Sequence, residues 1–211
     1  EKIRLAIKDD SPLVRKAAVH ALGERGEGRY VQDIILALAD EDREVRLAVA
    51  RVLGDIRSKE AVEPLLLLLS DEDIWVKAAA VESLGKIGTG NVLEAVKGLV
   101  DDENGMVVCT ALEAMAMIAL HGHQTIEEIK PWVVKCLSHD DVEVVKVAAQ
   151  ILGRLDKKGS VTEILSLLEH TNWDVRAHVV DILSDIKDNF IRSCLETHLK
   201  VETDDLVKQK I

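Results

Sequence analysis

A repeat with a fixed period constrains the fold of this chain more than any other feature of its sequence. One valine recurs at intervals of 31, 31, 31, 37 and 31 residues, by subtraction of the residue numbers, at Val14, Val45, Val76, Val107, Val144 and Val175. Three residues earlier stands a residue type that caps helix N-termini: Ser11, Asp42, Asp73, Asn104, Asp141 and Asn172. Because such side chains accept hydrogen bonds from unpaired N–H groups of a first turn, a helix is predicted to begin near each.

The residues after each valine predict which face of these helices is buried. Four residues later the side chains are small or β-branched: Ala18, Val49, Ala80, Ala111, Ala148 and Val179. Eight residues later they are long and apolar: Leu22, Leu53, Leu84, Met115, Leu152 and Leu183. Offsets of 0, 4 and 8 lie on one helical stripe, which is expected to face the core. The next position is mostly glycine, as at Gly23, Gly54 and Gly85, which lets neighbouring helices approach closely.

A shorter apolar segment precedes most of the capped helices, for example "YVQDIILALA" and "AVEPLLLLLS". Each repeat is therefore predicted to be two antiparallel helices, and neither helix can bury its apolar face alone. Stacking the pairs would create one continuous core. We expect an all-α, right-handed α-solenoid of about six helix pairs, which forms a single repeat domain over residues 1–211. A last pair near "FIRSCLETHL" is expected to be incomplete or to be capped by "VETDDLVKQKI".

The N-terminal segment "EKIRLAIKD" is predicted to be the first helix of the first pair, with Ile3 and Ile7 at an apolar edge. Preceding repeats, a second copy of the chain or a cap would each cover that edge. The sequence leaves these three alternatives open.

Composition limits the classes of function. Hydrophobic residues make up 47% and aromatic residues 2%, so the core must consist of Ala, Val, Leu and Ile. A net charge of −11 argues against general binding of nucleic acids or anionic membranes, because both require a basic surface. Cys109, Cys136 and Cys194 are far apart and lack CxxC spacing, which is typical of free thiols in a reducing, cytoplasmic environment.

These patterns resemble HEAT repeats, in particular the short type of phycobilisome-lyase-like proteins. The first helix has the form "AVEPLLLLLSD" and the second has the form "DIWVKAAAVESLGKIG". The resemblance implies a polar ladder between an acidic column before the cap and a basic column after the valine. The acidic column reads Asp9, Asp40, Asp71, Asp102, His139 and His170. The basic column reads Arg15, Arg46, Lys77, Val108, Val145 and Arg176. Within single repeats, Asp102 would face Val108 and His139 would face Val145.

The only change in repeat length falls within residues 118–130. Thr125 and Glu128 have capping-box spacing, so a helix is predicted to start there, and Pro131 is expected to bend or restart it. The extra residues fit either a binding loop or ordinary variation of an exposed loop.

No motif in the chain predicts catalysis or a cofactor. His121, His123, Cys136 and His139 are close in sequence but lack a zinc-ligand framework, so no metal is expected. Deoxyhypusine hydroxylase also uses HEAT-like repeats, but it carries His-Glu dyads, and this chain contains no His-Glu dipeptide. We therefore expect a protein that is not an enzyme.

The resemblance further implies that second helices line a concave surface. Their solvent-facing positions are expected at offsets −1, +2, +6 and +10 from the valine. In the central repeats these positions form an apolar patch of Leu47, Trp75, Ala78, Met106, Cys109 and Met117, rimmed by Arg51, Glu82 and Glu113. An apolar patch with a tryptophan and methionines is typical of a site that binds a peptide or helix. Alternatively, Trp75 packs over a neighbouring helix end.

The leading hypothesis is a non-enzymatic interaction scaffold that binds a segment of another protein in the concave groove. The alternative, by analogy with the family, is a bilin lyase or lyase-associated subunit that acts on phycobiliproteins. A HEAT-like DNA-repair glycosylase is a third possibility, which the acidic balance disfavours. The sequence does not predict the oligomeric state.

Overall fold

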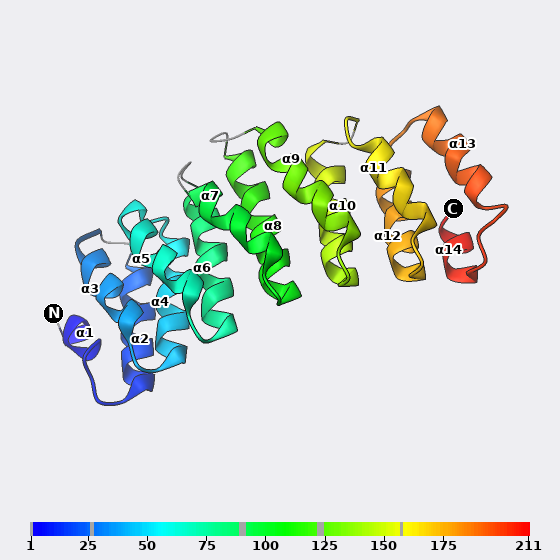
Figure 1. The fold of residues 1–211 in the computed structure, drawn as a ribbon. Coiled ribbons are helices and arrows are strands. Elements are labelled where there is room, and N and C mark those ends of the chain that lie inside the picture. The colour runs from blue at the N-terminus through cyan, green and yellow to red at the C-terminus, as the bar shows by residue number, and fades with distance from the viewer. Residues whose placement is uncertain (1, 26–27, 89–91, 122–124, 157) are drawn as a thin grey trace. The chain divides into compact units, whose positions relative to one another are not determined.

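The computed structural model describes residues 2–25, 28–88, 92–121, 125–156 and 158–211, and in these ranges every regular element is a helix (Figure 1). The chain divides into two compact units, residues 1–124 and residues 125–211. Each unit is described by itself below. Both are built from the predicted alternation of first and second helices, so the fold is an α-solenoid.

Unit 1 contains four described helix pairs. The first helices are α1 (Lys2–Ala6), α3 (Val31–Leu36), α5 (Val62–Leu67) and α7 (Val92–Lys97). The second helices are α2 (Pro12–Glu24), α4 (Arg43–Asp55), α6 (Ile74–Ile87) and α8 (Gly105–Leu120). Successive second helices pack directly against one another, α2 on α4, α4 on α6 and α6 on α8.

Unit 2 contains three pairs rather than the two that the valine column predicted. They are α9 (Ile126–Lys135) with α10 (Val142–Leu155), α11 (Val161–Ser166) with α12 (Trp173–Ser184), and α13 (Asn189–His198) with α14 (Asp205–Lys210). The third pair follows the same rules, because Asp204 caps α14 and Val207 is fully buried three residues later. The segment expected as a possible cap is therefore the start of another second helix, packed on α12.

The predicted 0, 4, 8 stripe is the core of the solenoid. Five of the six column valines have no exposed surface, as do their partners at offsets 4 and 8 in repeats two to six. Val14 is the exception and remains 40% exposed. Close packing depends on the small residues: a Cβ on Gly23 would lie 2.4 Å from Val52 Cγ1. Substituting a larger residue there would push two second helices apart.

All six predicted caps occupy the N-cap position, and five of them accept backbone N–H bonds through their side chains. Ser11 does not. Its own backbone N–H instead donates to Asp9 Oδ1 over 2.9 Å. The next three repeats contain the same local bond. In each, the backbone N–H of the cap residue donates to the carboxylate two positions before it, that of Asp40, Asp71 or Asp102.

The polar ladder exists, but it joins successive repeats rather than residues of one repeat. Arg46 donates from Nε and Nη2 to the two carboxylate oxygens of Asp71, over 2.9 and 3.0 Å. Arg15 binds Asp40 in the same way, and Lys77 Nζ lies 3.0 Å from Asp102. The expectation that Asp102 faces Val108 is therefore wrong, because Asp102 is paired with the basic residue of the preceding repeat.

The corrected register explains the two histidines in the acidic column. In both cases the preceding repeat has a valine where the basic residue would stand. Val108 precedes His139 in this way, and Val145 precedes His170. An unpaired carboxylate in this half-buried position would be costly. The imidazole Nδ1 keeps the local bond, because it accepts the N–H of Asp141 over 3.0 Å and of Asn172 over 3.1 Å.

The ladder resumes at the end of unit 2 with a glutamate. Arg176 donates to both carboxylate oxygens of Glu202, over 2.8 and 2.7 Å, and His198 Nε2 lies 2.9 Å from Glu202 Oε2. The Glu202 side chain is only 1% exposed. The hydrogen bonds from Arg176 outweigh burial and hold the pKa of Glu202 far below its ordinary value.

Much of the added length lies in two longer helices, α8 with 16 residues and α9 with 10, compared with 14 in α6 and 6 in α7. Helix α8 extends to Leu120, and α9 begins at Ile126, with Thr125 at the N-cap position but without a side-chain cap bond. Pro131 lies inside α9, which continues to Lys135, so the expected restart at this proline is wrong. Residues 122–124, including His123, lie outside the described residues.

Breaking one rung of the ladder should destabilise unit 1 strongly. Arg46→Ala would leave the Asp71 carboxylate, 7% exposed, without its cation, and we expect a loss of about 3 kcal/mol in the free energy of unfolding. Urea denaturation measures it. Arg51→Ala, on an exposed position of the same helix, is the control and should change stability by less than about 0.5 kcal/mol. Equal effects of the two substitutions would contradict a structural role for the ladder.

The lowered pKa of Glu202 also predicts acid sensitivity. A carboxylate whose pKa is depressed by folding stabilises the fold above the unfolded-state pKa, about 4.3, and this stability is lost as the pH falls below it. We expect Glu202→Gln to cost about 2 kcal/mol at pH 7 and to flatten the decline of Tm between about pH 5 and 3. Glu196→Gln, an exposed glutamate of α13, should leave both unchanged.

Candidate protein-interaction face

The predicted patch residues lie on three adjacent second helices of unit 1. Helix α4 carries Leu47 and Arg51, α6 carries Trp75, Ala78 and Glu82, and α8 carries Met106, Cys109, Glu113 and Met117. Helix α6 packs against α4 on one side and against α8 on the other. None of the nine residues is buried. They form what we call the α4–α6–α8 face.

The accessibility of this face follows from the repeat pattern. Side chains at offsets 0, 4 and 8 point into the core, so those at −1, +2, +6 and +10 are left toward solvent. Across the six repeats only one of these described positions is buried, Ala177 in α12, which is 3% exposed. The face is therefore a surface that the fold does not require for its own core.

Trp75 is the largest apolar side chain of the face and is 55% exposed. It lies in the first turn of α6, where its backbone N–H donates to the cap Asp73 Oδ1 over 2.9 Å. The cap holds the backbone of this residue in place while more than half of its surface stays in contact with water. Trp173 is 44% exposed at the start of α12, and Trp132 is half-buried, with Lys135 Nζ 6.0 Å from its ring centroid.

Met117 shows how closely the helices beneath the face approach. A Cβ on Gly85 of α6 would lie 2.8 Å from both Cα and Cβ of Ala114 in α8, and 3.1 Å from Met117 Cε. Met117 therefore extends from α8 over the backbone of α6. Unbranched methionine side chains adapt their shape to a partner, which suits an apolar surface between two helices.

The charged rim of the face is partly neutralised by its own ion pairs. Lys86 of α6 lies 2.8 Å from Glu82 and 2.8 Å from Asp55 of α4, and it is 29% exposed. Burial lowers the pKa of Lys86, but hydrogen bonds to the two carboxylates outweigh that effect and raise it. Glu82 is thus half of a cross-helix ion triad. Arg51, by contrast, extends into solvent beside the apolar residues.

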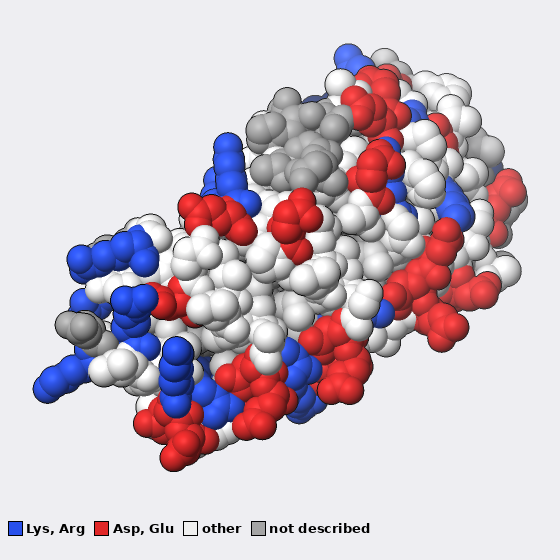
Figure 2. Space-filling model, turned by 60° about the vertical axis from the view of Figure 1, so that its left-hand side comes forward, with Lys and Arg blue, Asp and Glu red and all other residues white. Residues whose placement is uncertain are grey.

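Charge is unevenly distributed over the surface of the molecule. In the view of Figure 2, acidic and basic side chains lie around an area of uncharged residues. Each ladder pair connects the start of one second helix to the loop that precedes the next second helix. The pairs therefore concentrate charge at the helix ends.

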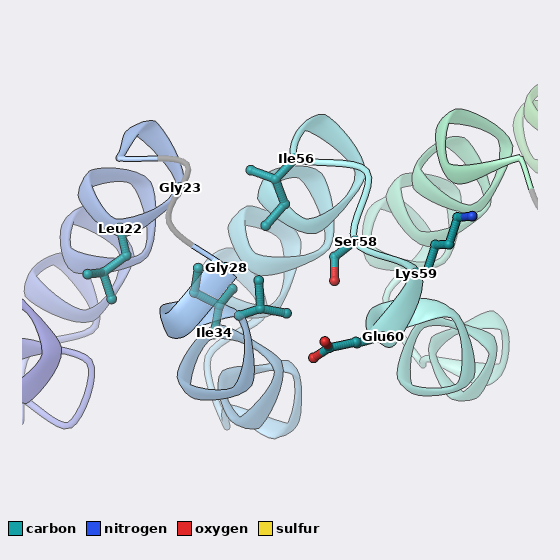
Figure 3. A pocket seen from close by; sticks show the side chains of 9 residues that line it. Leu22, Gly23, Gly28, Ile34, Ile56, Ser58, Lys59 and Glu60 are labelled. Atoms are coloured by element: carbon teal, nitrogen blue, oxygen red, sulfur yellow. The ribbon is translucent and has the colours of Figure 1, made fainter.

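The structure contains a pocket that sequence reasoning missed. It has a volume of about 280 Å³ and lies where α2, α3 and the segment after α4 meet. Leu22, Ile34 and Ile56 line one side, and Ser58 and Glu60 line the other (Figure 3). No sequence signal marks it, because its apolar residues are ordinary core positions of the repeat.

The described residues show no cluster of His, Cys, Asp and Glu suited to a metal ion. Cys136 is buried, and the Nδ1 of His139 is occupied by a backbone N–H. None of the helices within the described ranges has the length and hydropathy to span a bilayer.

The fold and the repeat pattern together define the class of protein, a HEAT-type α-solenoid. A family model for HEAT repeats matches residues 31–116, 63–145 and 129–211. The chain belongs to the HEAT-repeat family. A search of curated proteins finds no match.

Solved structures share the fold at low sequence identity. YibA of E. coli is 22% identical, with a TM-score of 0.66 over 98% of this chain and 78% of that one. A chain of the CpcE–CpcF complex of phycocyanin lyase from Nostoc sp. is 19% identical, with a TM-score of 0.62 over 99% and 90%. A designed armadillo repeat protein in complex with the peptide (KR)4 is 19% identical, with a TM-score of 0.56 over 87% and 97%.

The close approach of α6 and α8 predicts a sharp difference between two glycines. Gly85→Ala places its Cβ against the α8 backbone, so it should destabilise the protein by about 1–3 kcal/mol in urea denaturation. Gly98→Ala meets no atom within 4 Å and should be neutral or stabilising by up to about 1 kcal/mol. If Gly85→Ala were as harmless as Gly98→Ala, the helices beneath the face would not be held at this spacing.

Proposed function

We propose that this protein is a non-enzymatic interaction scaffold that binds a segment of another protein on the α4–α6–α8 face. The observation that carries the proposal is Trp75, which is 55% exposed among accessible apolar side chains of neighbouring helices. Covering a large, water-exposed aromatic side chain with a partner lowers the free energy of the complex. Tryptophan is also enriched among residues that dominate binding.

The repeat pattern strengthens this interpretation. The equivalent position holds Leu13, Glu44, Met106, Glu143 and Asp174 in other repeats, so stacking does not require an aromatic residue there. If Trp75 only packed over a helix end, that contact would cover less than half of its side-chain surface. Apolar residues of the face also lie on α8, whereas Lys86, Asp55 and Glu82 form an ion triad on α6 and α4.

The comparisons support protein binding in general terms. Among proteins of similar fold, the designed armadillo repeat protein was solved with a bound peptide, and CpcE and CpcF form a complex with each other. At 19% identity the likeness to the lyase shows the fold alone. No side-chain arrangement among the described residues favours the bilin-lyase alternative, so the scaffold is the function proposed here.

Trp75→Ala should weaken binding strongly and leave the fold intact. Affinity capture from native lysate with the wild-type chain identifies the partner, whose affinity is then measured for each variant. We expect Trp75→Ala to weaken binding by at least about 30-fold, because a central binding residue contributes 2 kcal/mol or more. Its stability should change by less than about 1 kcal/mol, since the side chain is mainly exposed. Met106→Glu should act similarly.

Trp173→Ala provides the matched control. It removes another exposed tryptophan near the start of a second helix, but in unit 2 and outside the proposed face. Binding should be unchanged in this variant. A fall of several degrees in Tm for Trp75→Ala, with unchanged affinity, would instead assign Trp75 to packing.

A further inference from the structure

Arg51 differs from the other basic residues of the three helices that form the α4–α6–α8 face. Helix α4 carries three arginines, α6 carries two lysines and α8 carries neither type. Four of these residues form salt bridges of 2.8–3.0 Å with carboxylates: Arg43, Arg46, Lys77 and Lys86. The side chain of Arg51 is exposed and forms no hydrogen bond or salt bridge with any residue that the structure describes. Its guanidinium is therefore available to a partner.

The two carboxylates best placed to bind Arg51 are both held by Lys86. Asp55 stands four residues after Arg51 on α4, and side chains four apart on a helix are neighbours. Glu82 occupies on α6 the repeat position that Arg51 occupies on α4, and these two helices pack together. Lys86 Nζ lies 2.8 Å from a carboxylate oxygen of each acid. The ion triad thus leaves an unpaired cation on the face of a chain whose net charge is −11.

The place of Arg51 on α4 links its charge to the apolar part of the face. Leu47 precedes it by four residues, so the two side chains lie one above the other on the same side of the helix. A segment that covers Leu47 therefore also reaches Arg51. Removing water from a guanidinium is costly unless another group replaces the lost hydrogen bonds. A carboxylate replaces them best, because it accepts two parallel N–H bonds from the same arginine.

We infer that the segment bound on the α4–α6–α8 face carries an aspartate or glutamate whose carboxylate pairs with Arg51, beside apolar residues that cover Leu47 and Trp75. The inference names the chemistry of the partner and rests on the proposed function. It also differs from what net charge alone suggests, because an acidic protein attracts basic segments. The carboxylates of Asp55 and Glu82 do not replace the partner's acid, since Lys86 already binds both.

Helix geometry sets the distance between the partner's carboxylate and the residue that covers Trp75. Arg51 stands at offset +6 of α4 and Trp75 at offset −1 of α6, on second helices that run in the same direction (Figure 1). The offset difference corresponds to about 10 Å along the axis, and neighbouring helices lie roughly 9 Å apart, so the two sites are roughly 14 Å apart. An extended segment spans this distance in about four residues, and a helix spans it in about nine.

The test uses random peptides of about 12 residues displayed on phage and selected on the immobilised full chain, at about 0.15 M salt to screen non-specific attraction. Peptides that bind the wild-type chain but not Trp75→Ala are synthesised with a fluorescent label, and their Kd is measured by fluorescence anisotropy. We expect them to share an Asp or Glu at the stated spacing from an apolar or aromatic residue. Replacing this acid with its amide should weaken binding by about fivefold or more, because a charge-assisted hydrogen bond is lost.

Charge reversal at Arg51 distinguishes a direct ion pair from a general preference for acidic peptides. Arg51→Glu should weaken binding of the acidic peptide by about tenfold or more, and should strengthen binding of a peptide in which Lys replaces the acid. Arg51→Gln adds no like charge and should remove most of the difference between acid and amide peptides. Arg192→Glu, at an exposed arginine of α13 outside the face, is the matched control and should leave all affinities unchanged. Thermal unfolding of each variant checks that the fold is retained.

The failure of this inference and the failure of the proposed function give different results. Trp75-dependent peptides without a shared acid, or an acidic peptide that binds Arg51→Glu as tightly as the wild-type chain, would overturn the pairing with Arg51 and leave the scaffold proposal standing. A selection that yields no peptide whose binding depends on Trp75 would overturn both.

Discussion

The stacking of second helices through the 0, 4, 8 stripe is the interaction on which the rest of this structure depends. Burying a valine or leucine stabilises the fold by roughly 1.5–3 kcal/mol, and five consecutive column valines are fully buried. The helices come close enough for this burial because glycine or another small residue stands where they meet. With almost no aromatic side chains in the core, close approach of the helices replaces side-chain bulk.

The ladder makes the stacking specific in register. A guanidinium that bridges from one repeat to a carboxylate of the next satisfies only one alignment of the two second helices, whereas apolar packing tolerates small slips. Its charges are half-buried, so each carboxylate requires its cation. The substitution of histidine for aspartate follows this requirement, as at His170 after Val145, because a neutral imidazole still accepts the local N–H bond. The acidic column thus depends on the basic column of the preceding repeat.

Much of this architecture could be predicted from the sequence because a period is a property of the sequence itself. The capped second helices, the buried stripe and the accessible positions all follow from spacing. The register of the ladder could not be predicted from the sequence, because spacing alone does not distinguish pairing within a repeat from pairing between repeats. The third pair of unit 2 was missed since its valine follows after 32 residues and its ladder residue is Glu202. The pocket at Leu22 and Ile56 depends on how loops close over the core, which periodicity does not describe.

A solenoid separates the residues that fold it from those available for binding more completely than a globular core does. The core of each repeat comes from the buried side of its two helices, and offset −1 of the second helix lies outside it, so stacking does not depend on the residue there. The column there ranges from Asp174 to Trp75, which shows that stacking sets no requirement at this position. The pattern of the repeat does not require the tryptophan that stands at this position in α6. The binding role that we propose for Trp75 rests on this separation between stacking positions and surface positions.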